Sequence, residues 1–213
     1  MSETLRVDLA NALSIVEREQ MINYALLYCR SNGLEGNYYE FGVGAGRTFV
    51  NALTFAEKHG MLEHMHFFGY DSFEGLPEPT GIDIGGPFNG GDYKYTKEYI
   101  ENLIPERFRE YVTLVPGWYE DTLVHPKDHY VPYDCAIAWI DCDLYYSTKS
   151  VMEFLAHKLM GGSVVILDDW FTFRADPRRG EQKAFREFVK KWKWKAQEFR
   201  KFSWHGNSFI VRK

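Results

Sequence analysis

Five short apolar runs recur along the chain and predict the strands of one sheet. They occupy residues 37–43, 64–71, 111–116, 134–141 and 162–168. Nearly continuous hydrophobic runs of this length are typical of parallel strands that are buried on both faces. We therefore expect a sheet of buried, mostly parallel strands.

The segments between these runs have the spacing of helices. After the fourth run, apolar residues stand at helical intervals, at Val151, Phe154, Leu155 and Leu159. We expect Ser147 to cap this helix and the glycines at 161 and 162 to end it. Strand, helix and strand in this order form a βαβ unit, so the chain is predicted to be a doubly wound, mostly parallel α/β sheet with helices on both faces.

The C-terminal part differs from this repeat. A helix after residue 181 places five apolar residues on one face, namely Ala184, Phe185, Phe188, Val189 and Trp192. Two β-like runs then surround His205-Gly206-Asn207, which predicts an antiparallel hairpin. Residues 75–92 are rich in glycine and proline and are expected to form one long loop, and no boundary divides the expected single domain of residues 1–213.

Composition narrows the class of protein. With 45% hydrophobic residues among 213, a disordered chain is excluded, and a net charge of -5 gives no overall attraction to nucleic acid or anionic membranes. No apolar run reaches 18 residues and no export signal opens the chain, so no membrane partner is expected. The cysteines Cys29, Cys135 and Cys142 match neither a zinc pattern nor a disulfide scaffold, which favours the cytoplasm.

A glycine-rich turn follows the first expected strand. Residues 40–46 read Glu-Phe-Gly-Val-Gly-Ala-Gly, and a helix is expected directly afterwards. A dinucleotide-binding G-x-G-x-x-G turn would need glycine where the chain has Arg47. The string instead fits E-x-G-x-G-x-G, the first motif of class I (Rossmann-like) S-adenosylmethionine (SAM) methyltransferases. This interpretation makes cofactor-binding candidates of Glu40, Gly42, Gly44 and Gly46; the alternative is a tight turn without a ligand.

Residues at the ends of the second and third strands extend this interpretation. Asp71 stands about 25 residues beyond the glycine turn, where a carboxylate can accept hydrogen bonds from ribose hydroxyls. Gly117 and Trp118 follow the third strand and could flank an adenine ring. Each also has a plainer interpretation: Asp71 as a turn or cap residue, and the Gly-Trp pair as a turn with a core tryptophan.

Four aspartates follow the last two parallel strands. Asp141 and Asp143 would point the same way from an extended chain, and Asp168 and Asp169 end the next strand. Two carboxylates about 4 Å apart repel by roughly 4 kcal/mol at an effective dielectric constant of 20. Either their pKa values rise or a cation neutralises them, and oxygen ligands without histidine or cysteine favour Mg²⁺, Mn²⁺ or Ca²⁺. We favour Mg²⁺; the alternative is a set of caps and turn residues.

Methyl transfer to a hydroxyl gives these carboxylates distinct expected roles. The sulfonium of SAM already activates the methyl group, whereas a hydroxyl is a poor nucleophile until it loses its proton. We assign Asp141, Asp168 and Asp169 to the metal, which lowers the pKa of the hydroxyl, and Asp143 to proton abstraction as the general base. Asp141 is expected to lie beside the cofactor as well.

Four motifs in order resemble the macrocin O-methyltransferase family. They are EFGVGAG, YDSFEGLPE, VPGWYEDTL and the long string from IDCDLYY to VILDDW. The resemblance implies a SAM- and Mg²⁺-dependent enzyme that methylates sugar hydroxyls in antibiotic biosynthesis. It implies the metal and base roles given above, and cofactor contacts at Glu40, Gly42, Asp71, Ser72, Gly117 and Trp118. Two departures are Cys142, where the family often has glycine, and a short stretch before the first motif, which implies a reduced N-terminal lid.

The acceptor is open between a sugar, a glycoside and a phenol. Six aromatic residues follow expected strand ends and suit the apolar face of a sugar or a flat polyketide: Tyr119, Tyr145, Tyr146, Trp170, Phe171 and Phe173. Each of them could equally pack a loop layer. A homodimer also stays open.

A basic segment offers a competing class of function. The segment from Lys183 to Lys201 contains eight lysines and arginines but only two glutamates, with aromatic residues among them. Such a basic segment could bind a phosphate backbone. A nucleic-acid-binding protein or nucleic-acid methyltransferase is therefore the alternative. It is disfavoured because the Asp-Pro-Pro-aromatic type of string of base methyltransferases is absent, and because an amphipathic helix needs no polyanion to solvate its basic face.

Overall fold

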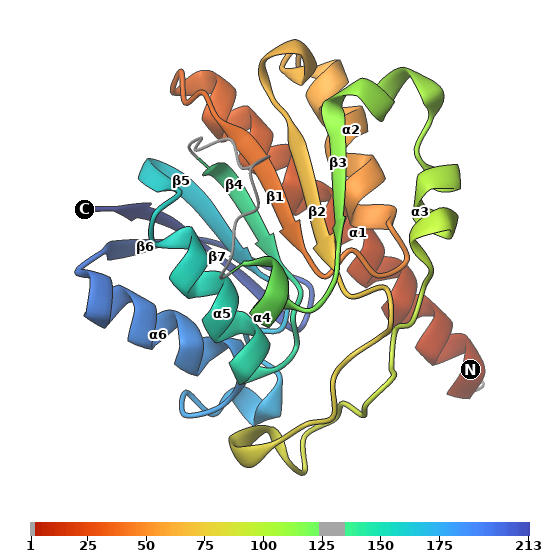
Figure 1. Cartoon of the computed structure of the whole chain (residues 1–213), viewed down its shortest axis with the longest axis vertical. Coiled ribbons are helices and arrows are strands. Elements are labelled where there is room, and N and C mark those ends of the chain that lie inside the picture. Colours follow the sequence, from red (N-terminus) through yellow and green to blue (C-terminus); the bar gives the residue numbers. More distant parts are fainter. Residues whose placement is uncertain (1–2, 124–134) are drawn as a thin grey trace.

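The computed structural model describes residues 3–123 and 135–213, and Figure 1 shows its central sheet with helices on both faces. Seven strands form this sheet: β1 (Asn37–Phe41), β2 (Phe67–Asp71), β3 (Val112–Pro116), β4 (Cys135–Ile140), β5 (Leu159–Leu167), β6 (Lys195–Phe202) and β7 (Gly206–Arg212). Their order is β3-β2-β1-β4-β5-β7-β6, with β1 to β5 parallel and β7 antiparallel to both β5 and β6. The predicted doubly wound sheet and its C-terminal hairpin are confirmed.

The helices of the described chain lie on either side of this sheet. They are α1 (Glu3–Ser31), α2 (Arg47–Lys58), α3 (Lys97–Leu103), α4 (Tyr119–Thr122), α5 (Tyr145–Leu155) and α6 (Gly180–Trp192). Helices α1 and α2 pack on one face, while α5 and α6 pack on the other (Figure 1). None of the helices in the described ranges is long and apolar enough to cross a membrane.

Alternate residues of the central strands supply these two hydrophobic layers. In β4, Ile137 and Trp139 pack with α1 and α2, whereas Ala138 and Ile140 pack with α5. All four are fully buried, and burial of a large apolar side chain contributes about 1.5–3 kcal/mol each. A strand that is apolar on both faces is therefore a continuous hydrophobic run in the sequence, which is the pattern that predicted it.

Helix α1 is a feature that the strand pattern did not predict. Its 29 residues precede the first strand, and Met21, Ile22, Ala25, Leu26 and Cys29 are buried against the sheet. These positions have the one-, four- and eight-residue spacing of a helical face, so a periodicity test of the N-terminal stretch would have found it. The short stretch before the first motif thus forms a long helix, whose earlier turns extend beyond the sheet (Figure 1).

The limits of α5 and β5 differ from the prediction. Helix α5 begins at Tyr145 with Leu144 as its N-cap, so Ser147 lies inside the helix and does not cap it. Leu159 begins β5, and the glycines at 161 and 162 lie within that strand. The cap instead comes from a distant loop, because the buried carboxylate of Asp83 accepts the Tyr145 N–H at 3.0 Å. Local sequence contains no sign of a capping group that lies 62 residues away.

The same contact fixes the long loop on α5. Asp83 ends the short 3₁₀ helix η2 (Gly81–Asp83), and Arg179 donates to the carbonyl oxygens of Ile82 and Ile84 at 2.7 and 2.8 Å. Residues 75–92 therefore form one loop, as predicted, but it is anchored at its middle.

We expect Asp83→Ala to lower the free energy of unfolding by about 1–2 kcal/mol, because the first turn of α5 loses its acceptor. Urea unfolding followed by circular dichroism measures this change. The control is Ile84→Ala, next in the loop and 66% exposed, which should stay within about 0.5 kcal/mol of the wild type. Equal stabilities of the two variants would contradict the capping role.

Candidate functional site

One cavity of about 680 Å³ lies at the carboxyl ends of the parallel strands. Ten of the residues predicted from the sequence line it: Gly42, Gly44, Gly46, Asp71, Ser72, Gly117, Trp118, Asp141, Asp143 and Asp169. Two others, Glu40 and Asp168, are fully buried and are not among its lining residues. The structure thus gathers most of the candidate cofactor and metal residues around one space.

The glycine turn after β1 brings backbone close to this space. Gly42 has a φ of 86°, and a Cβ there would lie 1.9 Å from the backbone oxygen of Asp141. Gly44 has a φ of 49°, and nothing lies within 4 Å of the position its Cβ would take. Gly42 therefore allows β1 and β4 to leave the sheet side by side, whereas Gly44 leaves open space in the cavity.

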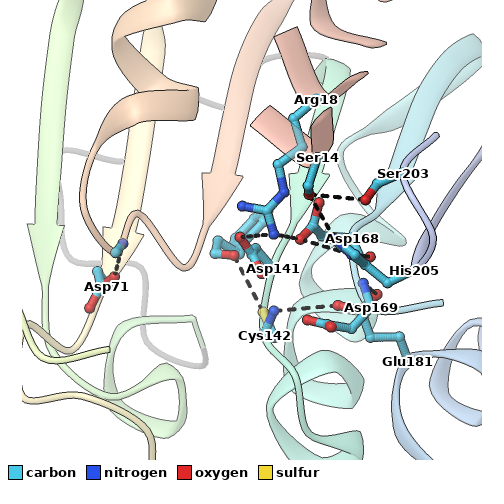
Figure 2. Close-up of polar contacts among 12 residues, drawn as sticks. Ser14, Arg18, Asp71, Asp141, Cys142, Asp168, Asp169, Glu181, Ser203 and His205 are labelled. Carbon is cyan, nitrogen blue, oxygen red and sulfur yellow. Dashed lines mark hydrogen bonds and ion pairs between the residues drawn. The ribbon is translucent and has the colours of Figure 1, made fainter. Parts of the chain in front are cut away.

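Asp71 connects the glycine turn with the end of β2. Its carboxylate accepts the N–H groups of Gly44 and Phe73 at 2.9 and 2.7 Å. Burial raises the pKa of Asp71, and these backbone donors partly oppose that rise. Figure 2 shows Asp71 apart from the other labelled carboxylates, on the side of the glycine turn. Neighbouring Ser72 donates to the carbonyl oxygen of Gly75 at 2.9 Å and shapes the loop that follows.

Three carboxylates converge at the ends of β4 and β5. Oxygen atoms of Asp141, Asp143 and Asp169 lie within 4.8 Å of one another. Burial and mutual repulsion hold the pKa values of Asp143 and Asp169 well above the usual range. We expected Asp143 to reach this group from an extended continuation of the strand. Its φ of 60° shows that it instead lies in a left-handed turn after β4.

Asp168 faces a different neighbour, Arg18 of helix α1. The guanidinium forms an ion pair with Asp168 and lies 3.8 Å from Asp141, between the two acids in Figure 2. Burial alone would lower the pKa of Arg18, but the surrounding carboxylates outweigh it and raise the pKa. Burial and Asp141 hold the pKa of Asp168 well above its usual range. Its second oxygen, Oδ1, is buried and has no hydrogen-bond partner among the described residues.

Glu181 of α6 holds the two aspartate-bearing loops together. Its carboxylate accepts the N–H of Asp169 at 2.9 Å and the N–H of Cys142 at 3.3 Å (Figure 2). Burial and the neighbouring aspartates hold its pKa well above the usual range. Under the cavity, Glu40 accepts the Tyr38 hydroxyl at 2.5 Å, and burial holds the pKa of Glu40 well above the usual range too.

His205, in the turn between β6 and β7, joins the chain ends at this site. Its Nδ1 lies 2.6 Å from the backbone oxygen of Asp168, and its Nε2 lies 3.2 Å from Ser14 Oγ of α1. Ser203 donates to the same Ser14 hydroxyl at 2.9 Å (Figure 2). Sequence reasoning missed Arg18, Glu181 and His205, because each meets its partners across a long stretch of chain and none belongs to a recognisable motif.

The basic segment is partly neutralised by its neighbours. Lys183 pairs with Glu187 within α6, and Lys191 pairs with Glu153 of α5 at 2.7 Å. Arg200 lies over the ring of Tyr24 at 3.9 Å. The segment is thus divided between α6 and β6, with carboxylates and an aromatic ring beside three of its cations.

Comparison with known proteins places the sequence in a family. The family described as Macrocin-O-methyltransferase (TylF) matches residues 9–195. A tetracenomycin-C rhamnosyl 4'-O-methyltransferase of Streptomyces olivaceus is 26% identical over 170 residues, and demethyldecarbamoylnovobiocin O-methyltransferase of Streptomyces niveus is 27% identical over 175 residues. Each alignment covers 76% of this chain and 63% of the relative, so the matched chain spans less than two thirds of their length.

Solved structures share the fold. The O-methyltransferase NovP superposes with a TM-score of 0.72 at 21% identity, covering 93% of this chain and 81% of NovP. The calicheamicin methyltransferase CalS11 gives 0.72 at 20% identity, covering 90% and 77%. Because the family match extends over most of the sequence, from α1 to the start of β6, the chain belongs to the macrocin O-methyltransferase family.

Proposed function

We propose that this protein transfers the methyl group of SAM to a hydroxyl of a sugar in a glycosylated natural product, with Mg²⁺ as the metal. The observation that carries the proposal is the shared cavity, in which the glycine turn and Asp71 lie beside the converging Asp141, Asp143 and Asp169. The names of the two Streptomyces relatives describe O-methylation of natural products, one of them on a rhamnosyl group.

The cofactor would occupy the half of the cavity over β1, β2 and β3. Gly44 leaves room where a side chain would project, and Asp71 is held by two backbone N–H groups with lone pairs remaining for ribose hydroxyls. Gly117 and Trp118, after β3, line the same half and would flank the adenine.

The converging aspartates suit a hard divalent cation, because Asp141, Asp143 and Asp169 all offer carboxylate oxygens. Asp168, outside this group, has a buried Oδ1 with no hydrogen-bond partner among the described residues. Asp141, Asp168 and Asp169 would hold the ion, with Arg18 balancing the charge of Asp168. When bound, the ion lowers the pKa of the acceptor hydroxyl and orients its oxygen.

Asp143 would then act as the general base. Its carboxylate takes the hydroxyl proton while the oxygen attacks the methyl carbon, the carbon–sulfur bond breaks and S-adenosylhomocysteine leaves. Burial and the charge of Asp141 raise the pKa of Asp143, which brings its basicity nearer to that needed for proton abstraction. Glu181 keeps the two loops in place through their backbone N–H groups.

The competing nucleic-acid function has weaker support. Its basic segment lies on α6 and β6, away from the lining of the cavity, and part of its charge is already paired. We also propose the cytoplasm as the compartment, because the three cysteines are odd in number and their spacings match neither a zinc pattern nor a disulfide scaffold.

We expect Gly44→Ala to weaken SAM binding by about tenfold or more, because the new methyl group enters the cavity where the cofactor would lie. Isothermal titration calorimetry with SAM measures the dissociation constant. Gly85→Ala is the matched control, because Gly85 also has a positive φ (73°) and open space at Cβ but does not line the cavity. Equal SAM affinities in the two variants would place the cofactor elsewhere.

Replacement of the base should separate chemistry from binding. Asp143→Asn should lower kcat by about 10²–10⁴-fold, because the amide cannot accept the proton, while the SAM dissociation constant stays within about twofold. Turnover is measured with radiolabelled SAM and either demethyldecarbamoylnovobiocin or TDP-rhamnose as acceptor. Asp121→Asn, on α4 outside the cavity lining, is the control. Full activity of Asp143→Asn would remove the proposed base.

Metal binding is tested directly, and the need for the metal in methyl transfer is tested by chelation. We expect Asp169→Asn to reduce Mn²⁺ affinity by at least about tenfold, measured by electron paramagnetic resonance, because one buried ligand oxygen loses its charge. EDTA should abolish methyl transfer by the wild type and added Mg²⁺ should restore it. Unchanged Mn²⁺ binding, or activity that survives EDTA, would exclude a metal at this cluster.

A further inference from the structure

The cavity has a second half that the cofactor motifs do not line. Those motifs follow β1, β2 and β3, and the aspartates follow β4 and β5. Beyond β5 the next strand is β7, whose Asn207 pairs with Leu167 at the end of β5. This register brings the hairpin tip, residues 203–205, to the carboxyl ends of the strands, on the far side of the aspartates from Asp71.

Trp204 at this tip lines the cavity and is 72% exposed. The tip that carries it is fixed, since the buried ring of His205 contacts both the Asp168 backbone and Ser14. The Trp204 and His205 rings lie 4.7 Å apart at 72°. Trp204 therefore presents a large aromatic surface to the cavity from a fixed position.

A second exposed aromatic residue, Tyr93, lines the same cavity. It is 62% exposed, and its loop is tied to residue 76 by the bonds Leu76 N–H to Asp92 O (2.9 Å) and Gly91 N–H to Leu76 O (2.8 Å). Burial, together with the charges of Asp143, Asp169 and Asp141, raises the pKa of Tyr93 to about 12. Trp204 and Tyr93, from distant parts of the chain, thus both line the cavity that the aspartates line.

Helix α1 supplies four residues of the cavity wall, of which Ile15 is apolar and three are polar. Asn11, Ser14 and Arg18 line the cavity along one side of the helix. Aromatic faces next to hydrogen-bonding side chains match a sugar ring, which has an apolar C–H face and an edge of hydroxyls. A flat phenol would call for aromatic or aliphatic walls without these polar groups.

We propose that Trp204 and Tyr93 form the acceptor subsite and hold a sugar ring between them, while Asn11 and Ser14 recognise hydroxyls that are not methylated. This inference rests on the proposed function and names the residues that would hold its sugar. Both aromatic residues determine specificity and hold the acceptor; neither takes part in proton or methyl transfer.

Binding of a sugar probe tests the subsite independently of turnover. Saturation-transfer NMR with methyl α-L-rhamnopyranoside, in the presence of S-adenosylhomocysteine, should show binding to the wild type. Trp204→Ala and Tyr93→Ala should each lose most of the signal, and Trp204→Phe should retain it because a ring face remains. Tyr24→Ala, at an exposed tyrosine of α1 outside the cavity lining, is the control and should bind as the wild type does.

Kinetics give the second measurement. With TDP-rhamnose as acceptor, Trp204→Ala should raise the acceptor KM by about tenfold and leave kcat and the SAM dissociation constant near the wild-type values. Trp118→Ala should show the reverse, with weaker SAM binding, because Trp118 follows β3 in the cofactor half.

The outcomes separate the two claims. Failure of the wild type to bind SAM would overturn the proposed function. SAM binding without rhamnoside binding, or rhamnoside binding that Trp204→Ala and Tyr93→Ala leave unchanged, would overturn the acceptor subsite alone. Binding of catechol that depends on Trp204, with no binding of the rhamnoside, would overturn the choice of a sugar.

Discussion

Crowding of buried negative charge at the ends of β4 and β5 is the constraint on which the rest of this structure depends. Six acidic residues gather there: Glu40, Asp141, Asp143, Asp168, Asp169 and Glu181. All except Asp141 have less than a tenth of their surface exposed. Within the described ranges, Arg18 and His205 are the basic side chains that approach these acids within 4.0 Å. Charges of one sign in a medium of low dielectric must be protonated, hydrogen-bonded or neutralised.

Three elements around the cluster supply the ion pair and hydrogen bonds that stabilise it. Helix α1 supplies the guanidinium of Arg18, α6 supplies Glu181 to hold the loops by their backbone N–H groups, and the hairpin tip fixes the Asp168 backbone through His205. Burial and the neighbouring carboxylates still hold the pKa values of Asp143, Asp168 and Asp169 well above the usual range. A divalent cation would complete the balance, and under the proposed function it would also prepare the acceptor.

The sequence was informative where function depends on short segments at strand ends. Continuous apolar runs predicted the parallel strands, and the glycine turn, Asp71 and the two aspartate pairs were placed at their carboxyl ends. The fold brings all of these except Asp168 to the lining of one cavity. It was uninformative where contacts span the chain. The cap of α5 by Asp83, the Arg18–Asp168 ion pair and the Glu181 bridge each join residues whose types are ordinary and whose spacing follows no period.

The two proposed halves of the cavity differ in the same way in how far the sequence predicts them. The half assigned to the cofactor is built from three successive strand-end turns and can be found from motifs, whereas the half assigned to the acceptor is built from α1, a long loop and the hairpin tip. A fold does not fix the substrate, so the acceptor has to be argued from the side chains of these segments. The residues alone left a sugar and a phenol open, and only the family resemblance implied a sugar.

The contact of Ser14 with Ser203 and His205 has a consequence for synthesis of the chain. Ser203 and His205 lie 189 and 191 residues after Ser14. Helix α1 therefore leaves the ribosome long before the turn that contacts it has been synthesised. Arg18 of the same helix cannot pair with Asp168 until most of the chain has been translated. The contact of Ser14 with the hairpin tip can thus form only after nearly the whole chain has been synthesised.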